Sequence, residues 1–92
     1  MKFASLLVVL LLLAACATSP PVQEMAAARS AIQTAKELSV GTLKAKKMLK
    51  SAEQSLGEAA EAIKEERYEY ARQLAVAAKR KAQKAAKLKH KP

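Results

Sequence analysis

The chain has 92 residues, with 17 Lys and Arg against 8 Asp and Glu, and a formal net charge of +9 at pH 7. This length supports one small domain, and the chain has only one His, one Cys and two Gly. No Ser/His/Asp or Cys/His set, carboxylate pair in a cleft, metal-ligand spacing or glycine-rich loop can be assembled from this stock. We therefore expect a protein that is not an enzyme and holds no metal or diffusible cofactor. His90 lies between two lysines near the end of the chain, where we expect it to be solvated.

The first fifteen residues have the three parts of a secretory signal peptide. Lys2 supplies a positive charge, residues 3–13 are almost wholly apolar, and small residues follow. The apolar run is too short for an ordinary transmembrane helix, which needs about 20 residues. We expect residues 1–15 to be cleaved from the exported chain.

The end of this segment, Leu13-Ala14-Ala15-Cys16, resembles the lipobox of bacterial lipoproteins. The resemblance implies that a lipoprotein signal peptidase recognises Leu13, Ala14 and Ala15 and cleaves before Cys16. It also implies a diacylglycerol on the Cys16 thiol and an acyl chain on the new α-amine, which together give a stable membrane anchor. A plain secretory signal with an incidental cysteine, or a short buried helix, is the alternative. Because Cys16 is the only cysteine, a disulfide framework is excluded.

The compartment follows from the anchor and from the residue after it. We expect a cell-envelope protein, lipid-anchored at Cys16. Ala17 follows the cysteine, and no Asp is present there to resemble an inner-membrane retention signal. If the host has two membranes, the outer membrane is therefore favoured, with the protein facing the periplasm.

The exported chain is expected to be a tether, residues 16–21, followed by a helical domain, residues 22–92. The tether is small, polar and proline-rich. Helix-forming residues then dominate, with no proline before Pro92, and we predict helices over about 22–38, 43–65 and 67–88. Gly41 suits the end of the first helix, and Thr42 suits the N-cap of the second.

Apolar residues recur at helical spacing along all three segments. The first helix has one such stripe, the second has small and large residues in strict four-three alternation, which is typical of a coiled coil, and the third has alanines only. Gly57, next to the second stripe, permits either a close helix approach or a slight bend. The stripes are Met25, Ala28, Ile32 and Ala35; Ala45, Leu49, Ala52, Leu56, Ala59 and Ile63; and Ala71, Ala75, Ala78, Ala82 and Ala85.

The segment between the second and third helices carries no proline or glycine, so one long helix is an alternative to a turn. The spacing of Ala59, Ala62, Ile63, Tyr68 and Ala71 resembles that of tetratricopeptide-like helical hairpins and favours a turn. Such hairpins have a glycine where Glu66 stands here. We predict an all-α fold, either a helical hairpin or a small three-helix unit, with coiled-coil-like and tetratricopeptide-like packing.

Three segments of the exported chain carry a wider resemblance. They are residues 24–29 (EMAAAR), the stripe from Leu49 to Ala59, and residues 68–75 (YEYARQLA). With the lipobox and the proline-containing tether, these resemble a family of short, uncharacterised, alanine-rich helical lipoproteins, whose relatives are sometimes joined to OmpA-like domains. The resemblance implies an envelope location and a helical hairpin, and it implies no known activity.

The last helix begins acidic and ends basic. Arg80, Lys84, Lys87 and Lys91 share one stripe, opposite the alanine stripe at 100° per residue. The helix macrodipole explains two or three cations at this end. Because more cations than that lie there, these four residues are candidates for anion binding. A merely solvated, charged helix end is the alternative.

Two functions are compatible with these features. The first is a membrane-anchored envelope lipoprotein with a structural or protein-interaction role, whose partners are membrane lipid, an envelope protein or a second copy of the chain. The second is an anion-binding module that docks its basic helix on lipid, lipopolysaccharide or a cell-wall polymer. Nucleic acid is disfavoured, because the chain is exported and no aromatic residue interrupts the basic run to stack on bases.

Overall fold

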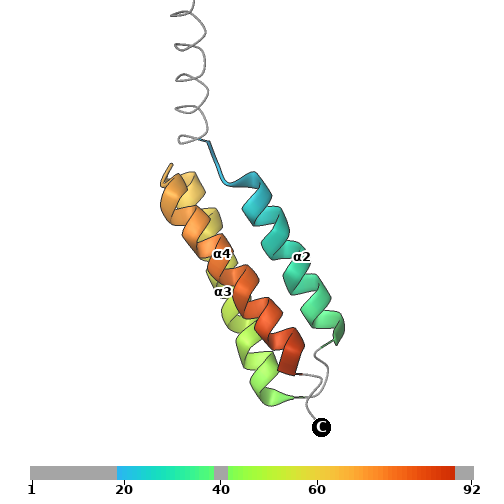
Figure 1. Ribbon diagram of the computed structural model, residues 1–92. Coiled ribbons are helices and arrows are strands. Elements are labelled where there is room, and N and C mark those ends of the chain that lie inside the picture. Colours follow the sequence, from blue (N-terminus) through green and yellow to red (C-terminus); the bar gives the residue numbers. More distant parts are fainter. Residues whose placement is uncertain (1–18, 39–41, 89–92) are drawn as a thin grey trace, which may run out of the picture.

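The computed structural model describes residues 19–38 and 42–88, which form three α-helices. They are α2 (Val22–Leu38), α3 (Leu43–Lys64) and α4 (Tyr68–Leu88). Figure 1 shows α3 and α4 as an antiparallel hairpin, with α2 lying along the hairpin and running in the same direction as α4. The fold is therefore an all-α, three-helix unit, in which α2 packs mainly on α4 and less closely on α3.

The starts of α2 and α3 follow from local sequence. Pro21 is fully buried beside the first turn of α2, and its carbonyl accepts a hydrogen bond from Met25 N at 3.0 Å. Thr42 has an extended backbone, and its hydroxyl accepts from Ala45 N at 3.2 Å, which caps α3 as predicted. Gly41 lies outside the described residues.

The turn between α3 and α4 is a Schellman motif formed without glycine. Arg67 N donates to Ala62 O at 2.9 Å, and Glu66 N donates to Ile63 O at 3.0 Å. Glu66 takes the left-handed conformation, with φ of 60°, at the position where glycine is usual. The chain therefore turns sharply here, and the alternative of one long helix is wrong. Relative to the predicted bounds, α3 ends one residue earlier because Glu65 is its C-cap. The second helix of the hairpin, α4, begins one residue later, at Tyr68, because Arg67 still belongs to the turn.

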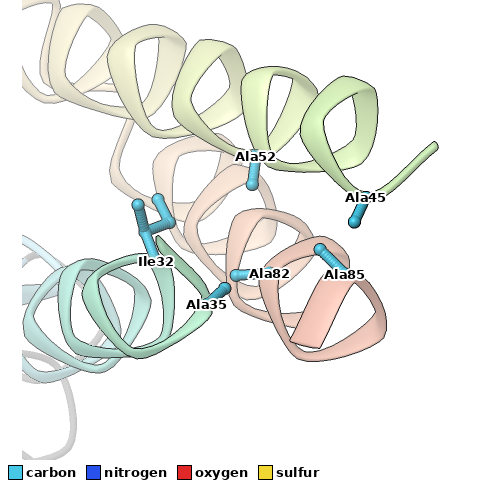
Figure 2. Packing of buried hydrophobic residues seen from close by; sticks show 6 residues of the cluster. All are labelled: Ile32, Ala35, Ala45, Ala52, Ala82 and Ala85. Atoms are coloured by element: carbon cyan, nitrogen blue, oxygen red, sulfur yellow. The ribbon is translucent and has the colours of Figure 1, made fainter. Parts of the chain in front are cut away.

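The core consists mostly of alanine. All the predicted stripe residues of α2 and α4 are buried, and in α3 the small members Ala45, Ala52 and Ala59 are buried. Figure 2 shows alanines of all three helices converging with Ile32. Small side chains allow the helix backbones to approach closely, and larger apolar side chains such as Leu56 and Leu74 pack against the edge of this core.

Three details of α3 differ from the predicted stripe. The three large members, Leu49, Leu56 and Ile63, are only partly buried at the edge of the core. Ser55, which periodicity did not single out, is buried with 6% of its surface exposed. Gly57 is exposed, and a Cβ atom placed there would meet no heavy atom within 4 Å, so no close helix approach depends on it.

Candidate anion-binding surface

The two ends of the three-helix unit carry different proportions of basic and acidic side chains. One end, which we call the turn end, holds the Glu65–Arg67 turn and the start of α2. At the other end, the basic end, α2 finishes, α3 begins and α4 finishes (Figure 1). The buried cluster of Ile32, Ala35, Ala45, Ala52, Ala82 and Ala85 joins the three helices there. Segments far apart in the sequence therefore bring their surface charges to one place.

Cations collect at the basic end, with few acids beside them. Within the described residues, α3 contributes four lysines, α4 contributes four cations and α2 contributes one. The carboxylates at this end are Glu37 and Glu53. The cations are Lys36, Lys44, Lys46, Lys47, Lys50, Arg80, Lys81, Lys84 and Lys87.

Local partners account for two of these cations. Lys36 Nζ lies 2.9 Å from Glu53 Oε1, and Lys81 Nζ donates to the Ser55 hydroxyl at 2.9 Å. The second contact gives the buried Ser55 hydroxyl a hydrogen-bond donor from α4, and it gives the ammonium group of the partly buried Lys81 an acceptor on α3. Glu37 accepts from the Gln33 amide at 3.4 Å. In the part of the chain that the structure describes, the seven other cations of the basic end have no ion pair.

The lysines at the start of α3 oppose the helix macrodipole. The first turn of α3 has no acidic residue, and Lys44, Lys46 and Lys47 lie in or next to it. Cations at a helix N-terminus are unfavourable by about 0.3–1 kcal/mol each at low ionic strength. Lys46 and Lys50 are also four residues apart, a like-charge pair that weakens a helix by a few tenths of a kcal/mol. The macrodipole therefore explains cations at the end of α4 but not those of α3.

The predicted basic stripe of the last helix is only part of this surface. Arg80, Lys84 and Lys87 are exposed, opposite the buried alanine stripe of α4. Lys91 lies outside the described residues, as do Cys16 and the signal-peptidase residues Leu13, Ala14 and Ala15. Sequence reasoning missed the contribution of Lys44, Lys46, Lys47 and Lys50. The signal was available, because an antiparallel hairpin places the start of one helix beside the end of the other.

The turn end is close to charge balance, and Lys64, Arg67 and Arg72 form ion pairs within it. It carries six carboxylates and five cations: Glu24, Glu58, Glu61, Glu65, Glu66 and Glu69, with Arg29, Lys64, Arg67, Arg72 and Lys79, the last of which lines a hollow with Glu24. Arg72 bridges two helices, with its Nε 3.3 Å from Glu24 and its Nη1 2.7 Å from Glu69. Lys64 and Arg67 pair with Glu61 and Glu65 at 3.3 and 3.9 Å, and Arg67 stacks 4.4 Å from the Tyr70 ring centroid.

A shallow hollow of about 370 Å³ opens between α2 and α3 at the turn end. Apolar residues and two cations line it: Pro20, Val22, Met25, Ala60 and Ile63, with Arg29 and Lys64. Its lining within the described residues contains no Ser, Thr, Cys, His, Asp or Glu. Within residues 19–38 and 42–88, no group of His, Cys, Asp or Glu is placed to hold a metal ion. In the same residues no helix is both long and apolar enough to cross a membrane.

These features define a small, three-helix, alanine-cored protein with a cationic surface at one end. Residues 23–90 match the family described as Domain of unknown function (DUF4398), and the chain belongs to that family. No curated protein and no solved structure matches the chain.

Proposed function

We propose that this protein is a lipid-anchored, non-catalytic protein of the cell envelope that attaches to a polyanion through its basic end. The observation that carries the binding role is the group of unpaired cations on α3 and α4, including lysines that oppose the α3 macrodipole. These cations weaken the free helix through their repulsion of the macrodipole and of one another, and a bound anion relieves this repulsion. A purely solvated surface would gain nothing from lysines at the start of α3.

The proposal of a lipid anchor is supported by the sequence from Leu13 to Cys16 and by the short segment between Cys16 and the first helix. Only five residues separate Cys16 from Val22, where α2 begins. Acyl chains on Cys16 therefore hold the three-helix unit close to a membrane. If the host has two membranes, we place the protein on the outer one, facing the periplasm.

The anchor is tested by Cys16→Ser in cells given a fatty-acid analogue. The wild-type chain should take up the label and be cleaved, because the thiol accepts the diacylglycerol. The variant should stay unlabelled and keep residues 1–15. An unlabelled wild-type chain, or a labelled variant, would contradict lipidation at this residue.

The binding role is tested with polyglutamate and polyphosphate as soluble probes. Lys46→Gln, Lys47→Gln and Lys50→Gln together should weaken binding by up to about a hundredfold, taking about 1 kcal/mol for each cation near an anionic surface. The same variant should be as stable as the wild type or more stable at low salt, because the changes remove cations near a helix N-terminus. Reduced binding with retained stability separates loss of a ligand site from loss of the fold.

The matched control removes three cations from the turn end: Arg29→Gln, Lys64→Gln and Arg67→Gln. It has the same net charge as the basic-end variant and should bind both probes nearly as well as the wild type. Equal losses in the two variants would mean that net charge alone attracts polyanions. No loss in either would mean that the basic end is only a solvated surface.

A further inference from the structure

The path of the chain into the three-helix unit fixes which end lies near the anchor. Pro21 is fully buried, and Val22 N donates to Pro20 O at 2.9 Å while Met25 N donates to Pro21 O at 3.0 Å. These contacts hold the entering chain against the first turn of α2, at the turn end. Residues 16–21, fully extended, reach about 20 Å at most.

The basic end lies far from this point. At about 1.5 Å per residue, the 22 residues of α3 separate the two ends by about 33 Å. The Debye length at physiological ionic strength is about 8 Å. When the three-helix unit stands on its turn end, the basic end is therefore electrostatically independent of the anchoring membrane.

The turn end suits the membrane-proximal position. Val22 is 69% exposed and lines the apolar hollow together with Ile63, while Arg29 and Lys64 lie at the same hollow. Apolar residues flanked by cations match the interface between acyl chains and anionic headgroups.

The side chains at the basic end select a diffuse polyanion. Eight of its nine cations are lysines, which act as mobile point charges rather than as the planar, bidentate forks that arginine offers to a single carboxylate or phosphate. Both tyrosines, Tyr68 and Tyr70, start α4 at the turn end, so no described aromatic ring is available there to stack on a base or a sugar. Repeated anionic groups along a polymer fit this arrangement, and an end directed away from the membrane meets the carboxylates of the cell wall.

We infer that the anchored protein directs its basic end away from its own membrane and binds a carboxylate-bearing cell-wall polymer there. This inference rests on the proposed function and adds its orientation and its partner. The protein then joins two structures, a membrane at the turn end and the wall at the basic end, across the length of α3. Binding to lipid of its own membrane is the competing arrangement.

Orientation is tested with tryptophan reporters, because the chain has no Trp. Gln83→Trp marks an exposed position of α4 at the basic end, and Val22→Trp marks the turn end. Each acylated variant is placed in vesicles containing anionic phosphatidylglycerol and a quencher-labelled lipid. We expect strong quenching at position 22 and little at position 83. Equal quenching at both positions would overturn the outward orientation without affecting the anchor or polyanion binding.

The partner is tested by co-sedimentation of the same vesicles with purified cell-wall sacculi. Vesicles that carry the wild-type protein should sediment with sacculi whether or not they contain phosphatidylglycerol. Those with the Lys46, Lys47 and Lys50 variant should stay in solution. Those with the Arg29, Lys64 and Arg67 control should sediment when the vesicles lack phosphatidylglycerol, where the two cations at the hollow have no anionic headgroup to contact. Loss of sedimentation on adding phosphatidylglycerol would show docking on the protein's own membrane and overturn the inference.

Binding of polyglutamate by the wild-type protein distinguishes a wrong wall partner from a wrong proposed function. If the wild-type protein binds polyglutamate but sacculi fail to sediment its vesicles, the proposed function stands and the wall partner is wrong. If it binds neither polyglutamate nor polyphosphate, the proposed function itself fails.

Discussion

Replacing Glu66 by glycine should stabilise the protein, because this residue holds a backbone conformation that L-residues avoid. Its φ of 60° costs an L-residue about 1–2 kcal/mol. Glycine avoids this cost but loses about 0.5–1 kcal/mol more backbone entropy on folding. The net expectation is a gain of about 0.5–1 kcal/mol in the free energy of unfolding. The Schellman hydrogen bonds from Glu66 N and Arg67 N involve only the backbone and remain.

The assay is urea unfolding of the unlipidated chain from Ala17 onward, followed by circular dichroism. Glu66→Gly should raise the midpoint without changing the slope, and in a thermal scan it should raise Tm by about 2–8 °C. Glu66→Ala is the control, since it removes the same carboxylate but keeps a Cβ atom, and it should not be more stable than the wild type. If glycine gave no gain over alanine, the left-handed turn at residue 66 would be refuted.

Three further changes test the packing and the ion pairs. Gly57→Ala should stabilise α3 by about 0.8–1 kcal/mol, because the position is helical and the space around it is open; a loss measured by urea unfolding would mean that a neighbour fills that space. Ala75→Leu should cost about 1–3 kcal/mol by overpacking where α4 meets Met25 and Ala59, whereas an exposed alanine of α2 changed to Leu should be nearly neutral in the same assay. A double-mutant cycle of Arg72→Gln with Glu24→Gln should give a coupling of about 0.5 kcal/mol that falls with salt, since both side chains are about one third exposed; zero coupling at low salt would remove this link between α2 and α4.

Much of the fold was predictable because alanine marks the close-packed face of a helix. Ala28, Ala75 and Ala82 fall where a 3.6-residue period places the interior, and they are buried. Periodicity did not single out Ser55, because its burial depends on Lys81 reaching across from another helix. The turn at Glu66 was predicted from spacing alone, since its residue type argues against a left-handed backbone.

The candidate surface was less predictable than the fold, because it depends on which helix ends meet. When each helix is considered alone, Arg80 and its neighbours are cations at a helix C-terminus, where the macrodipole favours them. The lysines of α3 are then ordinary surface residues. The structure brings both groups to one end. Only this juxtaposition shows that the cations outnumber the carboxylates locally.

Because the alanine core contributes little stability, the repulsion between the lysines at the basic end is a large cost for this protein. Alanine buries little apolar surface per position, and a small domain has few kcal/mol in reserve. The chain nonetheless keeps Lys44, Lys46 and Lys47 at the start of α3, where an acidic residue would stabilise the helix instead. At the turn end the same chain places Glu69 in the first turn of α4 and pairs it with Arg72 at 2.7 Å, so its helix starts are not uniformly basic. The charges therefore stabilise the start of α4 at the turn end and destabilise the start of α3 at the basic end. This is the pattern expected when the basic end binds an anion.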